Sequence, residues 1–430
     1  MHYEDNTPSS DYKTLVRNML FLMIGTASSQ LITLGFAPLL TRLYGPEAFG
    51  LLGTFISITG ALGPAIALSY PLAIVLSESR REAAALAYLS LIISSVTICL
   101  VAASLWFGRS WIIDMLGISL NTSYLLLVPV ALICASFSQV ATQWLIREQA
   151  FTTITKANIA QSLFVNITQA VAGLFHPIGT VLIAISTTGQ AVLTALLLRG
   201  IGKQAQGKSK ATIIPKHEMF RAAHAYSDFP AFRAPQNLIN SLSVHLPVLL
   251  FATFLGPESA GHYILARLVV GVPTNLAGKA IGEAYYPWIT QASRNDGNMQ
   301  AILKRDTAIL ILLGAIPLGI LIFFGPYLFA GVFGVQWATA GEYSRWLAVF
   351  YFFNFINRPC VAAIPALKLQ KGLLQYELVS TSCKLLVLVF GVIWLENGIH
   401  GVAMYAAVGA LCYTVLIAWV LHHAGVAKST

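Results

Sequence analysis

Four basic side chains lie inside long apolar segments of this chain, where a charge is costly. They are Arg267, Lys279, Arg358 and Lys384, and the clear acid in such a segment is Glu283. Burying a charge in hydrocarbon costs several kcal/mol by most estimates, so such residues usually face a cavity or a partner. Glu283 follows Lys279 by one helical turn, so the two can neutralise each other. The remaining charge is positive and suits the binding of an anion such as a phosphate.

Each of these cations also has a purely structural interpretation. Arg267 lies well inside its run, where its guanidinium can hydrogen-bond to backbone carbonyls of a neighbouring helix. Lys279, Arg358 and Lys384 lie closer to the ends of their runs, where long basic side chains can extend to the lipid headgroups. We therefore take Arg267 as the strongest candidate and keep the other three.

Amide and imidazole groups follow helical spacing in two further places. A polar stripe of this kind lies on one face of a helix. In lipid that face must look inward, where it either contacts a polar substrate or joins helices. Both interpretations stay open. The two sets are Asn237, Asn240 and His245 in one run, and Asn354 and Asn357 directly before Arg358 in another.

Little else in the sequence suggests chemistry. Glu283, Asp228 and His245 are weak candidates for coupling transport to protons or sodium, and the sequence does not decide between these ions. The five cysteines are far apart and lack metal-ligand spacing. We expect no metal site and no cofactor.

The elements that carry these residues must be membrane helices. The chain is 57% hydrophobic and 10% charged, with a mean hydropathy of +0.72, whereas soluble domains carry about 25% charged residues. A spanning helix needs about 20 apolar residues, and barrel strands would alternate over about ten. The sequence therefore predicts an all-α polytopic membrane protein with about twelve spans. They cover approximately 15–41, 49–75, 84–107, 120–145, 154–174, 178–198, 236–255, 261–286, 307–328, 343–364, 373–394 and 399–421.

Two repeated motifs predict two related halves. Gly-Pro-Glu-x-x-Gly occurs at 45–50 and 256–261, an offset of 211 residues, and Phe107-Gly108 with Gly117 recurs at an offset of 217. Six spans in each half is an even number, so the halves are parallel six-helix bundles around a central cavity. The predicted domains are a cytoplasmic tail at 1–11, bundles at 12–200 and 223–424, a basic linker at 201–222 and a second tail at 425–430.

The distribution of Lys and Arg predicts the orientation. Most of them fall in the N-terminus, the even-numbered loops and the C-terminus, whereas the odd-numbered loops hold Arg42, Arg109 and Arg345. Both termini should be cytoplasmic. The net charge of +9 thus needs no nucleic acid as a partner, because basic loops under a bilayer account for it.

Three stretches resemble bacterial polysaccharide-biosynthesis flippases. Residues 37–58, APLLTRLYGPEAFGLLGTFISI, look like the first hairpin of that family, and 226–273 and 324–341 extend the resemblance over essentially the whole chain. It implies the multidrug, oligosaccharidyl-lipid and polysaccharide exporter superfamily, with two six-helix bundles and a V-shaped cavity. It also implies translocation of undecaprenyl-diphosphate-linked oligosaccharides of O-antigen or capsule across the inner membrane. The cationic lumen of that family assigns substrate contacts to Arg267, Arg358 and Lys384 by environment, and other polysaccharide-assembly proteins become candidate partners.

Three other classes of protein remain as alternatives. A cation-coupled multidrug exporter of the same superfamily would be expected to carry more intramembrane carboxylates than this chain has. A membrane polymerase would need a large periplasmic loop with catalytic residues, and the odd-numbered loops here are short. A scaffold would need no polar stripes inside its spans. We expect a transporter and not an enzyme.

Overall fold

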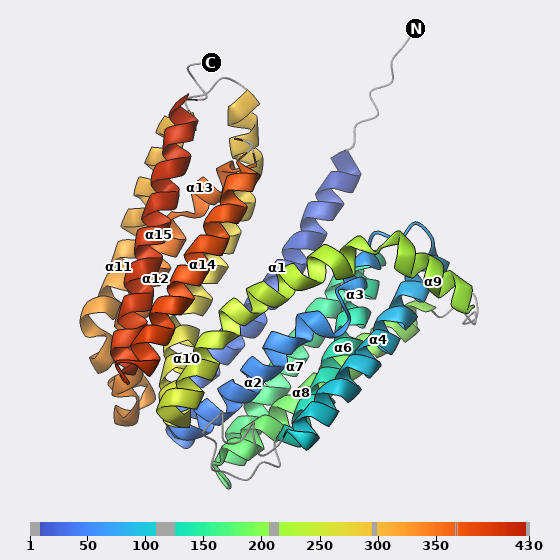
Figure 1. The fold of residues 1–430 in the computed structure, drawn as a ribbon, viewed down its shortest axis with the longest axis horizontal. Helices are drawn as coiled ribbons and strands as arrows, with labels where there is room; N and C mark the ends of the chain where they lie inside the picture. The colour runs from blue at the N-terminus through green and yellow to red at the C-terminus, as the bar shows by residue number, and fades with distance from the viewer. Residues whose placement is uncertain are drawn as a thin grey trace. The chain divides into compact units, whose positions relative to one another are not determined.

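The computed structural model describes residues 9–108, 125–205, 215–294, 299–365, 367 and 369–426, and these ranges contain helices and no strand (Figure 1). The prediction of an all-helical protein is confirmed, whereas Gly117 of the second repeat lies outside the described residues. The elements are α1 (Ser9–Leu43), α2 (Pro46–Ile66), α3 (Tyr70–Ala73), α4 (Arg80–Phe107), α6 (Leu127–Arg147), α7 (Phe151–Gly173), α8 (Gly179–Ala205), α9 (Lys216–Ala225), the π-turn η2 (Phe229–Arg233), α10 (Ala234–Arg294), α11 (Met299–Phe333), the 3-10 turn η3 (Val335–Trp337), α12 (Ala338–Ile356), α13 (Arg358–Ala363), α14 (Gln370–Ile393) and α15 (Gly398–Val426).

Eight helical segments of the described chain are long and apolar enough to cross a membrane. They overlap nine of the twelve predicted runs, because the runs at 236–255 and 261–286 both lie in α10. Of the other three runs, two fall in α1 and α7, and the third extends over α12 and α13. The chain is a multi-pass membrane protein, and the count of twelve spans in two six-helix bundles stays a prediction.

Gly256 lies between the two predicted runs that α10 joins, and it kinks the helix there. Its φ of 86° and ψ of 168° interrupt α10 without ending it. Only glycine adopts this region at no steric cost, so the kink depends on the residue type at this position. The second copy of the motif therefore marks a kink between two helical arms, whereas at the first copy α1 ends at Leu43 and α2 begins at Pro46.

Local capping signals fix several helix starts. Ser79 caps α4 by accepting a hydrogen bond from the Glu82 amide at 3.1 Å, while the Glu82 carboxylate accepts one from the Glu78 amide at 3.0 Å. This resembles the reciprocal pairing of a capping box. Asn397 caps α15 by accepting hydrogen bonds from the amides of Ile399 and His400.

Side-chain and backbone packing divide the chain into two compact units. Unit 1 comprises Met1–Leu43 and Phe55–Leu246, and unit 2 comprises Tyr44–Thr54 and Pro247–Thr430. This division follows the packing rather than the repeat, since the segment 44–54 of the first half belongs to unit 2 and 223–246 of the second half to unit 1. Both α2 and α10 therefore contribute to both units.

Because segment 44–54 belongs to unit 2, the two repeated motifs lie together in that unit. A Cβ atom on Gly50 would overlap the carbonyl oxygen of Pro257, and a Cβ atom on Gly261 would overlap the carbonyl oxygen of Pro46. The last glycine of each motif thus packs on the proline of the other. Backbone atoms cannot rotate away as a side chain can, so this reciprocal contact requires glycine at both positions.

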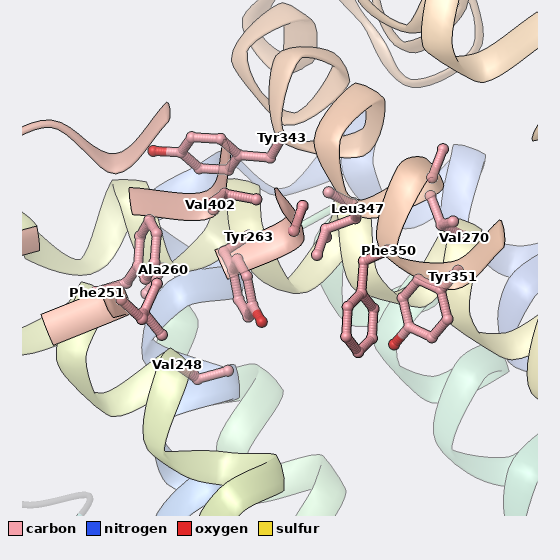
Figure 2. Close-up of a cluster of buried hydrophobic side chains, with 14 of the residues drawn as sticks. Val248, Phe251, Ala260, Tyr263, Val270, Tyr343, Leu347, Phe350, Tyr351 and Val402 are labelled. Carbon is pink, nitrogen blue, oxygen red and sulfur yellow. The ribbon is translucent and has the colours of Figure 1, made fainter. Parts of the chain in front are cut away.

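Each unit has its own core. In unit 1, α9 packs on α4 through Ala222, and Arg81 lies 3.9 Å from the Glu218 carboxylate. In unit 2, α11 packs on α12 and α14 on α15 (Figure 1). The centre of unit 2 is a cluster of buried aromatic and aliphatic side chains that includes Phe251 and Tyr263, whose rings stack 4.9 Å apart (Figure 2).

Candidate functional site

Arg358 is the hub of a hydrogen-bonded network in unit 2. It starts α13 directly after α12 ends, and Pro359 follows in the first helical turn, where its missing N–H costs nothing. Nη2 of Arg358 donates to Oδ1 of Asn354 at 3.0 Å and to Oδ1 of Asn275 at 3.2 Å. Asn354 in turn donates from Nδ2 to the Tyr413 hydroxyl at 2.7 Å. One network therefore connects α10, α12, α13 and α15.

Arg267 joins this network through Tyr351. The Tyr351 hydroxyl lies within interaction range of the side chains of Arg267 and Asn275. Figure 2 shows Tyr351 beside Phe350 in the buried cluster, with the two ring centroids 5.3 Å apart. The structure thus connects through Tyr351 two predicted arginines that are 91 residues apart in the chain.

Two glycines of α10 make room for the network. A Cβ atom on Gly271 would lie 2.6 Å from the Tyr351 hydroxyl, and one on Gly278 would lie 2.7 Å from Nε of Arg358. Real Cβ atoms essentially never approach other atoms this closely. Arg267, Gly271, Asn275 and Gly278 follow helical spacing, so α10 presents its cation, its amide and its two gaps on one face.

Lys384 adds a third cation through aromatic rings. Its Nζ atom lies 5.7 Å from the centroid of Phe350 and 5.6 Å from that of Tyr413. Ammonium groups within about 6 Å of a ring face are attracted by its quadrupole. Because Tyr413 also accepts the hydrogen bond of Asn354, Lys384 lies at the edge of the same network.

The network is positively charged, and the hydrogen-bond partners of Arg358 are neutral amides. Neither Arg358 nor Lys384 forms an ion pair with any residue that the structure describes. Nε of Arg358 and Oδ1 of Asn357 are buried and have no hydrogen-bond partner among the residues that the structure describes. Glu377 of α14 interacts electrostatically with Lys384, so Arg358 is the cation that has no acid beside it among the described residues. A guanidinium of this kind suits the binding of an anion.

The polar stripe at the start of α10 makes contacts of a different kind, inside unit 1. Asn237 donates from Nδ2 to the Ser69 hydroxyl at 3.1 Å, and His245 packs on Gly60. Ser241 donates to the Gly60 carbonyl at 2.6 Å. The proline at position 64 has no N–H to donate to that carbonyl, so Ser241 replaces the missing helical bond. These contacts join α10 to α2 and to Ser69, the residue before α3, and the proposed substrate contacts of this stripe stay predictions.

The remaining predicted residues are not among the network contacts described above. Asn240, Asp228 and Lys279 are exposed, and Asn357 is buried at 2% exposure beside Arg358. The side chain of Glu283 lies outside the described side chains, so its pairing with Lys279 stays a prediction.

Three residues of the network were not predicted, namely Asn275, Tyr351 and Tyr413. Two of them carry a sequence signal, because Asn275 follows Arg267 by eight residues and Tyr351 precedes Asn354 by three, on the same helical faces. Tyr413 carries none, since its partner lies 59 residues away in the chain.

Comparison with known proteins identifies the family of the chain. A family model described as polysaccharide biosynthesis protein matches residues 39–342. No curated protein is significantly similar to the chain.

Several solved structures are similar in fold. An inward-facing multidrug resistance MATE family transporter of the MOP superfamily has a TM-score of 0.67 at 15% identity, covering 97% of this chain and 99% of its own. The lipid II flippase MurJ, in an inward closed conformation, has a TM-score of 0.70 at 12% identity over 93% and 87%. A variant of the Vibrio cholerae MATE transporter VcmN has 0.56 at 15% over 95% and 96%.

At these identities the structural likeness establishes the fold alone. The family model, in contrast, matches well over half of the chain. The protein therefore belongs to the polysaccharide biosynthesis protein family and has the fold of the MOP superfamily.

Proposed function

We propose that this protein is a flippase that moves undecaprenyl-diphosphate-linked oligosaccharide repeat units across the bacterial inner membrane by alternating access. The repeat units would belong to an O-antigen, capsule or exopolysaccharide. The observation that carries this proposal is the cationic network of Arg267, Arg358 and Lys384, in which Arg358 has only neutral hydrogen-bond partners among the described residues and Lys384 lies over two aromatic rings. Membership of a polysaccharide biosynthesis family supports the same substrate class.

A diphosphate is the ligand that this network suits best. Guanidinium groups bind phosphate oxygens through paired, charge-assisted hydrogen bonds. Without ligand, the amide oxygens of Asn275 and Asn354 accept the donors of Arg358. Neutral acceptors are easier to replace than a carboxylate, because a carboxylate would compete with the diphosphate as a second anion. The site can therefore take up and release an anion reversibly, as a transport cycle requires.

The cycle needs no covalent step. The diphosphate and its glycan enter the protein while the prenyl chain remains in the bilayer, and a conformational change then opens the site to the other side. A cationic drug is a poorer ligand for this network, since it would face three positive groups. This argues against the multidrug alternative, which the experiment below also tests.

The direct experiment is leaflet assignment in a deletion strain. Lipid-linked oligosaccharide is extracted and its leaflet assigned with a membrane-impermeant glycosidase or lectin, with and without the wild-type gene. We expect the intermediate to accumulate on the cytoplasmic face and to reach the periplasmic face when the gene is restored. Single repeat units that reach the periplasm unpolymerised would indicate a polymerase, and an unchanged glycan would favour drug export.

Two arginine variants test the network itself. Arg358→Ala and Arg267→Ala should lower export at least about tenfold, and the Lys variants should lose less, because a charge remains but the paired geometry does not. Arg221→Ala, on the exposed surface of α9, is the matched control and should export normally. Equal, normal export by the Ala and Lys variants would contradict the role.

A further inference from the structure

Unit 1 contains a cavity of its own, formed only by residues of that unit. It has a volume of about 550 Å³ and lies among α2, α6, α7 and α8. Ligand pockets typically measure about 300–1,000 Å³. None of the residues that line it is Asp, Glu, Lys, Arg or His. The cavity is thus large enough for a ligand and offers that ligand no counter-ion.

Three glutamines from three different helices reach this cavity. They are Gln139 of α6, Gln161 of α7 and Gln190 of α8. Gln190 is held in place, since its Nε2 atom donates to the Ser138 hydroxyl at 2.9 Å. Gln139 and Gln161 are half-buried and make no hydrogen bond to a residue that the structure describes. Each of these two amides therefore keeps two donors and one acceptor for a ligand.

Hydroxyl groups complete the polar lining. Ser186 accepts a hydrogen bond from Gln169 at 3.1 Å, while Thr59 and Thr187 donate theirs to carbonyls of their own helices. The hydroxyls of both threonines thus keep lone pairs for a ligand donor, and the amides keep donors for a ligand acceptor. A ligand that matches must donate and accept at several points without carrying charge.

A sugar is the chemical class that meets this requirement. Each sugar hydroxyl donates one hydrogen bond and accepts others, as the amides of Gln139 and Gln161 do. A charged group would be desolvated without a partner, and a prenyl chain would leave both amides unsatisfied. We propose that this cavity, which we call the amide pocket, binds a neutral part of the oligosaccharide. This inference rests on the proposed function and adds a second subsite to it.

The test measures binding of the glycan and binding of the diphosphate separately. Purified full-length protein in nanodiscs is titrated with two probes, the neutral oligosaccharide released by mild acid from the strain's lipid-linked fraction, and farnesyl diphosphate. The double variant Gln139→Leu, Gln161→Leu should weaken oligosaccharide binding about tenfold or more, since it removes two amides. It should leave farnesyl diphosphate binding unchanged. Arg358→Ala should show the reverse pattern.

Controls keep failure of the amide pocket distinct from failure of the flippase proposal. Gln370→Leu, exposed at the start of α14, should bind both probes normally. If the double leucine variant is not recovered as folded protein, Gln139→Asn with Gln161→Asn shortens both amides and should lower oligosaccharide affinity severalfold. Wild-type oligosaccharide affinity in a folded double variant would overturn the amide pocket, while leaflet assignment would still decide the flippase. Parallel loss of both probes would also overturn it.

Discussion

The amide pocket of unit 1 and the cationic network of unit 2 handle polar groups in opposite ways. In the amide pocket, neutral side chains of three helices point at a cavity, and Gln139 and Gln161 keep their hydrogen-bonding capacity for a ligand. In the network, the cation Arg358 is surrounded by neutral acceptors that already use part of its capacity. The amide pocket therefore keeps its polar groups available for a ligand, whereas the network uses neutral side chains to stabilise its charge.

The difference follows from the cost of each group in an apolar surrounding. Leaving a buried amide without a partner costs about 1–3 kcal/mol, whereas a buried charge without support costs more. A glutamine amide therefore needs no supporting protein partner before the ligand binds. A guanidinium needs neighbours such as Asn275 and Asn354, and glycine gaps such as Gly278, to be held inside a helical bundle.

The largest expected effect is loss of ligand binding at both regions, caused by a change that destabilises the fold. Gly50→Ala places a Cβ atom on the Pro257 carbonyl oxygen, and overpacking against backbone costs about 1–3 kcal/mol or more. We expect a lower midpoint of thermal unfolding in detergent and parallel loss of both binding activities per milligram of protein. Gly45→Ala, which meets no atom within 4 Å, is the control. A Gly50→Ala protein as stable as wild type would show that the reciprocal glycine contact is not required.

A smaller change should affect the network and spare the amide pocket. Gly278→Ala puts a Cβ atom 2.7 Å from Nε of Arg358, so the guanidinium must shift away from Asn275. Farnesyl diphosphate affinity should fall about fivefold, in line with the loss of one hydrogen bond, with oligosaccharide affinity unchanged. Gly319→Ala, also in unit 2 and with open space around it, should change neither. If both affinities fell after Gly278→Ala, the two regions could not be treated as independent.

The smallest effect should come from the edge of the network. Lys384→Gln removes the cation above Phe350 and Tyr413, an interaction worth about 0.5–2 kcal/mol. We expect farnesyl diphosphate affinity to drop only a fewfold and its dependence on salt concentration to become shallower. Lys371→Gln, an exposed cation on the same helix, should leave both quantities unchanged. An unaltered salt dependence in Lys384→Gln would exclude this lysine from the anion site.

Helical periodicity predicted part of the candidate site, because residues on one face of one helix are related by spacing alone. Asn354 and Arg358 were predicted in this way, and their hydrogen bond is observed at 3.0 Å. The same reasoning did not distinguish substrate contacts from helix contacts. The stripe of Asn237 and His245 has equivalent spacing, and its observed contacts are with Ser69 before α3 and with Gly60 of α2.

Partners on different helices could not be predicted from spacing. Asn275 and Arg358 are 83 residues apart, and Asn354 and Tyr413 are 59 apart. The amide pocket was missed for the same reason, since its three glutamines come from three helices and none stands out in its own run. Such sets exist only once the helices pack.

The sequence by itself determined the membrane class, the helical content, the family resemblance and the repeated glycine motif. These depend on composition and on local periodicity, which a single chain displays without folding. Tertiary structure alone decided that Gly50 and Gly261 pack reciprocally on the prolines of each other's motif. It also decided that the cations gather around Asn275 and Tyr351, and that three amides share one cavity. Those outcomes depend on which helix faces meet, and helix packing sets this through shape and burial rather than through sequence order.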